Sequence, residues 1–189
     1  MNTHRKTAII VGVLMLLAYS VLGTGNPEAK ILGMLLEVIS GLAVITIAVL
    51  MFPLFKPYNK IASFWYLVFR CIEGGLLIVT GILFLSYNIL LLEIYSGIHA
   101  AHGYIFAIAA LIFYYLLYQS ILIPRWLSVW GLIAAILLIL VNLLEVTGII
   151  SELMILKLPI VLNELFLAIW LIVKGFNPSA IASESAKSK

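Results

Sequence analysis

The chain has 189 residues, of which 65% are hydrophobic and only 10% are charged. A soluble domain has about half apolar and about a quarter charged residues, so soluble fold classes are excluded. Several apolar runs reach about 20 residues, which is enough to cross a hydrocarbon core of about 30 Å. The net charge of +3 does not indicate nucleic-acid binding, because the basic residues lie mostly between the apolar runs. One cysteine, Cys71, excludes an internal disulfide and a cysteine metal cluster.

The apolar runs predict an all-α fold, an integral membrane bundle of six transmembrane helices in one domain over residues 1–176. The first run follows basic residues as a signal peptide does, but no Ala-x-Ala site comes after it, so we expect an uncleaved helix. Residues 89–96 are expected to be an apolar connector, and residues 177–189 a short disordered tail. The predicted helices cover residues 7–22, 28–55, 61–86, 97–119, 125–147 and 153–174.

The distribution of basic residues predicts the orientation in the membrane. Six helices place both termini on one side, and loops rich in Lys and Arg stay in the cytoplasm. The opposite side holds only Lys30 and Lys157. We therefore expect a plasma-membrane protein with both termini in the cytoplasm. The basic residues on the side of the termini are Arg5, Lys6, Lys56, Lys60, Arg125, Lys174, Lys187 and Lys189.

The third apolar run carries two opposite charges, Arg70 and Glu73. Residues three apart lie on one face of a helix and can form a contact. An Arg near the bilayer centre costs about 3 kcal/mol, whereas each Leu, Ile, Val or Phe contributes only about 0.5 kcal/mol in favour of insertion. The third helix is therefore marginal by itself and should need polar partners from its neighbours.

Other polar residues fall at matching depths along five of the six predicted helices, at about 1.5 Å per residue. They occupy the middle and the half of each helix away from the termini, which predicts one cluster that opens toward the outside. Glu37 lies between Gly33 and Gly41, a row of small residues that lets another helix approach closely. The candidate ligand-binding or proton-coupling residues are Glu37, Arg70, Glu73, His99, His102, Asn142, Glu145, Asn163 and Glu164.

The charges of this cluster do not balance. Its four carboxylates face Arg70 and Lys157, so either some are protonated or a cation lies among them. A metal ion is one candidate cation, with His99, His102, Glu73 and Glu145 as the candidate ligands, although His-x-x-His is a weak pattern. No nucleotide is expected, because the chain has no glycine-rich phosphate loop. No haem is expected either, because no second helix offers a facing histidine.

These observations favour a protein that binds or transports a small cationic or amphiphilic ligand, with proton coupling through Glu73 and Glu164. One alternative is an intramembrane enzyme, metal-dependent in one version, that acts on a lipid or isoprenoid. Another is a structural or accessory subunit whose buried charges only fix helix packing. The expected partners are membrane lipids and a small molecule or ion, without nucleic acid. The oligomeric state and the choice between transporter, enzyme and scaffold stay open.

Four stretches resemble a known family. They are residues 70–74 (RCIEG), 120–131 (SILIPRWLSVWG), 158–164 (LPIVLNE) and 168–177 (AIWLIVKGFN). They resemble the uncharacterised bacterial and archaeal membrane proteins grouped as domain of unknown function 4386, and the likeness covers nearly the whole chain. The resemblance implies a small multi-pass prokaryotic membrane protein. It implies no activity, substrate or catalytic residue.

Overall fold

The protein is all-helical over the residues that the computed structural model describes, which are 3–20, 30–85, 89–150 and 154–181. No strand occurs in these ranges. The sequence explains the all-helical structure, because each long apolar run between turns has the length and composition of a helix in lipid. The helices are α1 (Thr3–Ala18), α2 (Lys30–Phe55), α3 (Lys60–Phe84), α4 (Ile89–Ser120), α5 (Arg125–Val146) and α6 (Met154–Val173).

Five of these helices are long and apolar enough to cross a membrane. They are α2, α3, α5, α6 and the Gly97–Ser120 part of α4. The length and composition of these helices therefore confirm the prediction of a multi-pass helical membrane protein. Helix α1 has 16 residues and is not among the five, so a sixth span stays a prediction.

Two predicted boundaries are wrong. The expected connector at residues 89–96 is the first part of α4, since helix α4 begins at Ile89 and no proline or glycine interrupts it before Gly97. The predicted start of the disordered tail, at residue 177, is too early in the chain. Residues 178–181 form a helical turn, and the backbone N–H of Asn177 donates to the carbonyl of Leu122 at 2.8 Å. The tail beyond residue 181 lies outside the described residues.

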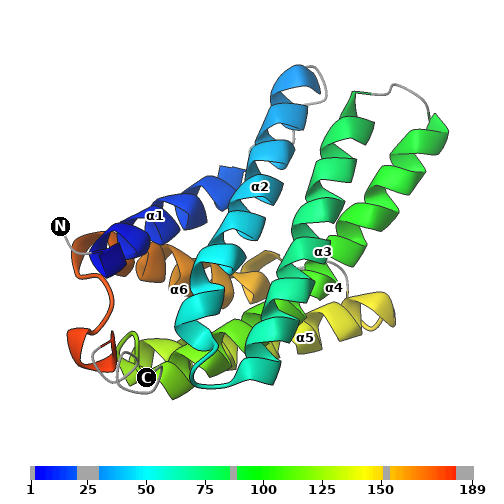
Figure 1. Cartoon of the computed structure of the whole chain (residues 1–189). Helices are drawn as coiled ribbons and strands as arrows, with labels where there is room; N and C mark the ends of the chain where they lie inside the picture. Colours follow the sequence, from blue (N-terminus) through cyan, green and yellow to red (C-terminus); the bar gives the residue numbers. More distant parts are fainter. Residues whose placement is uncertain (1–2, 21–29, 86–88, 151–153, 182–189) are drawn as a thin grey trace.

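The six helices form a closed ring. Each helix packs against the one before and the one after it in the chain, and α1 packs against α6 to close the circle. Figure 1 shows α1 and α6 side by side, far from each other in sequence. One end of this ring, the terminal face, carries the start of α1, the turns at 56–59 and 121–124, and residues 174–181. We call the opposite end the far face.

Arginine 5 fastens the two ends of the chain at the terminal face. Its guanidinium donates to the carbonyls of Leu171, Ile172 and Val173 at 3.2, 2.8 and 3.0 Å. The last carbonyls of a helix have no partner within the helix and carry partial negative charge. A cation from α1 therefore caps α6 and holds the ring closed there.

Helices α2 and α3 approach most closely at a pair of glycines. A Cβ atom on Gly41 would lie 2.5 Å from the carbonyl oxygen of Gly74, and a Cβ on Gly74 would lie 2.5 Å from the carbonyl of Gly41. Only the missing side chains allow this contact, as the small-residue row of α2 predicted.

Replacing Gly74 with alanine is expected to lower the free energy of unfolding by about 1–3 kcal/mol, the usual cost of overpacking. Thermal unfolding of the purified protein in detergent measures this. Gly75 is the matched control, since a Cβ there meets nothing within 4 Å. Gly75→Ala should leave stability unchanged or raise it by up to about 1 kcal/mol through helix propensity. Equal effects of the two variants would contradict the close contact.

Candidate functional site

A cavity of about 590 Å³ lies inside the ring, and residues of all six helices line it. Apolar side chains such as Leu77, Leu138 and Ile160 form much of its wall. It extends to Ile150 and Met154, next to the loop between α5 and α6, and so toward the far face. Seven of the nine predicted site residues line it: Arg70, Glu73, His99, His102, Asn142, Glu145 and Glu164.

The floor of the cavity is an arginine with two carboxylates. Arg70 Nη1 donates to both oxygens of Glu73 at 3.1 and 3.0 Å, which confirms the predicted contact within α3. Arg70 Nη2 lies 3.8 Å from Glu164 Oε1, close enough for attraction but beyond a hydrogen bond. All three side chains are buried. The floor thus joins the middle of α3 to the middle of α6.

Tyrosine 19 completes the floor from the end of α1. Its hydroxyl donates to Glu164 Oε2 at 2.9 Å. This residue was not predicted as part of the site, because a tyrosine near the end of an apolar helix is usually an interfacial anchor. Nothing in its local sequence distinguishes the two roles.

An aromatic layer lies beneath Arg70, on the side of the terminal face. The guanidinium carbon is 5.6, 5.5 and 5.9 Å from the ring centroids of Tyr66, Phe106 and Phe113, within cation–π range. Tyr66 and Phe113 stack with centroids 5.3 Å apart, and both are essentially inaccessible. The layer closes the cavity from below.

The wall formed by α4 carries a column of four neighbouring rings. Tyr95, His99, His102 and Phe106 follow at spacings of four, three and four residues, so they share one face of the helix. Successive ring centroids are 5.5, 5.6 and 6.5 Å apart. His102 Nε2 lies 3.8 Å from Glu73 Oε1, so the column reaches the charged floor.

The upper part of the cavity carries an ion pair between α5 and α6. Lys157 Nζ lies 2.9 Å from Glu145 Oε2, and both side chains are partly exposed. This contact joins the end of α5 to the start of α6. Asn142 Nδ2 donates to the carbonyl of Gly103 at 3.3 Å and ties α5 to α4 at the same level.

Two predicted site residues do not line the cavity. Glu37 is fully buried and accepts a hydrogen bond from the Tyr95 hydroxyl at 2.7 Å, so it joins α2 to α4. Asn163 is also fully buried, and its Nδ2 donates to the carbonyl of Leu127 on α5 at 3.2 Å. Both side chains hold helices together.

The candidate metal ligands are not assembled into one site. Among the described residues, no three His, Cys, Asp or Glu side chains are grouped so that they could hold a metal ion. His99, His102 and Glu73 line the same cavity, but Glu145 pairs with Lys157. The structure therefore does not support the predicted set of His99, His102, Glu73 and Glu145.

Several polar atoms at the floor have no hydrogen-bond partner within the described structure. Those on side chains that line the cavity are Arg70 Nε and Glu164 Oε1, both of them buried. Buried polar groups are nearly always satisfied by protein, water or ligand. These atoms mark where a polar group bound from the cavity would find partners.

Apolar helices of membrane-spanning length, packed in a ring around ionisable side chains, define a multi-pass membrane protein. The chain belongs to the family described as Domain of unknown function (DUF4386), which matches residues 17–101 and 85–175. This confirms the resemblance seen in the sequence. Neither the curated proteins nor the solved structures contain a significant match.

Proposed function

We propose that the cavity binds or transports a small amphiphilic organic cation. The observation that carries this proposal is the charge of the floor, where two buried carboxylates, Glu73 and Glu164, share one guanidinium. The pair of Lys157 with Glu145 is neutral as a unit. With ionised carboxylates and neutral histidines, one negative charge at the floor is therefore uncompensated among the described residues, and a cation would be attracted strongly in this poorly polarisable interior.

The remaining lining supports an amphiphilic ligand over a bare ion. A cavity of about 590 Å³ falls within the range typical of small-molecule sites. Its apolar wall, with Leu77, Leu138, Ile160 and Val161, would receive a hydrophobic part while the cationic group meets Glu164. Glu73 and Glu164 are also the carboxylates that would take up protons when the cation leaves, which is the basis for proton exchange.

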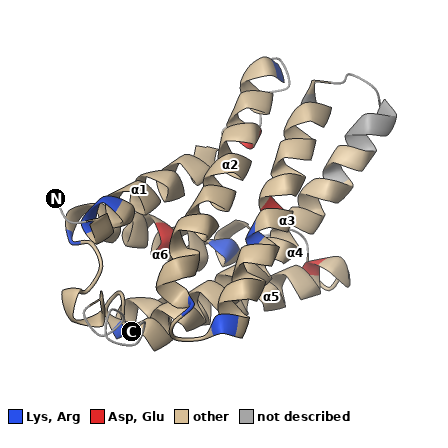
Figure 2. Ribbon diagram, in the orientation of Figure 1, with Lys and Arg blue, Asp and Glu red and all other residues tan. Residues whose placement is uncertain are grey.

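The distribution of charge supports an outward-opening cavity in a plasma-membrane protein. Figure 2 shows blue segments gathered toward the terminal face, and the positive-inside rule places such a face in the cytoplasm. Lys30 and Lys157 lie toward the far face, where the cavity extends. Helix α1 would be a short sixth span, at about 24 Å by helical rise. The described basic residues of the terminal face are Arg5, Lys6, Lys56, Lys60, Arg125 and Lys174.

Binding of tetraphenylphosphonium to the purified protein, measured by equilibrium dialysis in detergent, tests the proposal. We expect saturable binding by the wild type and at least about a tenfold loss in Glu164→Gln, equivalent to about 1.4 kcal/mol. Tetraphenylborate has the same shape and the opposite charge, so it should not bind.

Glu37→Gln is the matched control, because Glu37 is an equally buried carboxylate outside the cavity. It should leave binding unchanged. Binding of the borate as tightly as the phosphonium, or equal losses in Glu37→Gln and Glu164→Gln, would show that the floor does not select cations. A stable wild type without any cation binding would favour the structural-subunit alternative.

A further inference from the structure

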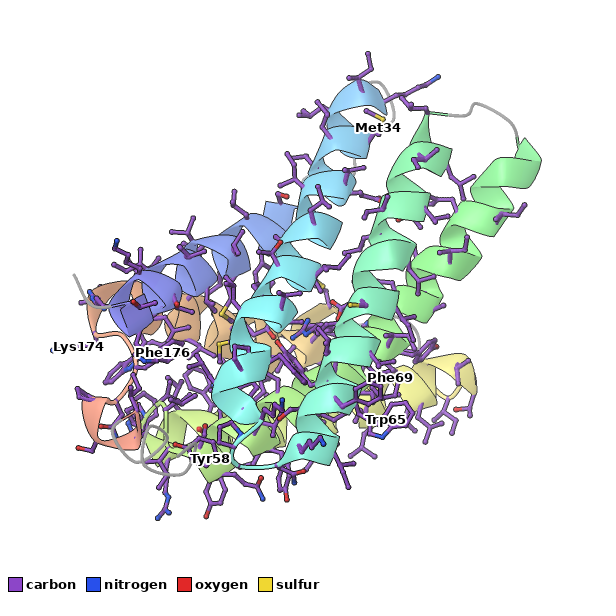
Figure 3. All side chains as sticks on the ribbon, in the orientation of Figure 1. Met34, Tyr58, Trp65, Phe69, Lys174 and Phe176 are labelled. Atoms are coloured by element: carbon purple, nitrogen blue, oxygen red, sulfur yellow. The ribbon has the colours of Figure 1, made fainter. Side chains whose placement is uncertain are left out.

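A second hollow lies on the outer surface of the ring, between α3 and α4, near the terminal face. Its volume is about 470 Å³, and it is separate from the cavity inside the ring. Figure 3 shows Trp65 and Phe69 projecting from the lower part of α3, where they form one side of this groove. The lining residues are Asn59, Ile61, Ala62, Trp65, Phe69, Ile112 and Tyr115.

The groove faces the membrane. Both helices that form it are candidate spans, Lys60–Leu83 and Gly97–Ser120. Its side chains remain open on the protein surface, with Ile61 73% and Trp65 48% exposed. In a bilayer the molecules that cover such a surface are lipids, and their acyl chains match its apolar floor of Phe69 and Ile112.

The end of the groove nearest the terminal face is polar and basic. Asn59 caps α3 through its side chain, and Lys60 follows it with an exposed side chain. On the α4 side, the Arg125 guanidinium lies 5.6 Å from the ring centroid of Tyr118, one turn beyond Tyr115. Among the described residues no carboxylate lies on the terminal face, because the described Glu side chains belong to the cavity and to the α2–α4 contact.

We propose that this groove is a binding site for an anionic phospholipid. An acyl chain lies along Trp65 and Phe69 toward Ile112, and the headgroup phosphate meets Lys60 at the level of Asn59. An aromatic groove alone would accept any lipid. The basic end of the groove, which has no carboxylate near it among the described residues, selects a negatively charged headgroup. Each Lys near the membrane surface favours anionic lipid.

Fluorescence quenching of Trp65 by lipids with brominated acyl chains tests this site directly. The other three tryptophans lie on α5 and α6 and pack with Phe166 of α6, so replacing Trp126, Trp130 and Trp170 with phenylalanine leaves Trp65 as the reporter. In phosphatidylcholine vesicles, brominated phosphatidylglycerol should reach half-quenching at about a fivefold lower mole fraction than brominated phosphatidylcholine, as expected for one lysine near anionic lipid.

Lys60→Gln in the same background should abolish the difference between the two lipids. Lys174→Gln is the matched control, because Lys174 is also exposed on the terminal face but lies at the end of α6. Equal quenching by both lipids, or a preference that survives Lys60→Gln, would overturn the proposal and leave only non-selective lipid contact. If the triple variant does not fold, the difference in quenching between wild type and Trp65→Phe gives the same readout. No cavity ligand is needed, so this result is independent of cation binding.

Discussion

Replacing Arg70 with methionine is expected to lower the free energy of unfolding by about 3–5 kcal/mol, the usual cost of removing one partner from a buried ion pair. Arg70 is 7% exposed and is the guanidinium that both Glu73 and Glu164 approach. Without it, two carboxylates would be left buried and close together. Unfolding by denaturing detergent in mixed micelles measures the loss.

Neutralising the carboxylates should reverse much of this loss. We expect Arg70→Met combined with Glu73→Gln and Glu164→Gln to be clearly more stable than Arg70→Met alone, because the buried charges are then absent. Such non-additivity is the sign of residues in one network. A loss below about 1 kcal/mol in Arg70→Met, typical of an exposed pair, would show that water reaches the floor freely.

Truncating Phe113 to alanine should cost about 3–5 kcal/mol, as large aromatic-to-alanine changes do in a packed core. Phe113 is 1% exposed and contacts Tyr66, Phe55 and Tyr114 as well as the guanidinium of Arg70. Its removal leaves a void directly below the floor. Thermal unfolding in detergent measures this loss.

Phe64→Ala is the control for Phe113→Ala, since Phe64 is 53% exposed on the outer face of α3. It should cost less than about 1 kcal/mol, because little buried contact is lost. If both phenylalanine variants lose the same stability, the aromatic layer beneath Arg70 is not a packed element of the core.

The contacts within one helix could be predicted from sequence, because helical spacing alone determines them. The contact of Arg70 with Glu73 follows from a separation of three residues. Depth along each helix also placed His102 and Glu164 at the level of the cavity that they line. These inferences need only the helix period and the membrane thickness.

The contacts between helices depend on how each helix is rotated about its axis, which the sequence did not determine. Glu37 and Asn163 have the expected depth, but they face neighbouring helices instead of the cavity. Lys157 and Glu145 meet because α5 and α6 are adjacent in the ring. Tyr19 reaches Glu164 because the ring closes between the first and last helices, a consequence of topology that no local pattern carries.

The ion pair of Arg70 with Glu73 within α3 also has a consequence for biosynthesis. Ribosomes deliver α3 to the membrane before α4, α5 and α6 exist, so Arg70 must enter lipid with the partners made so far. Glu73, three residues later in the same helix, gives it a counter-ion that arrives with it. Glu164 comes with the last helix and finds both Tyr19 and Arg70 already in place. A chain that stops before α6 lacks the second carboxylate, so the floor is complete only once α6 has been made.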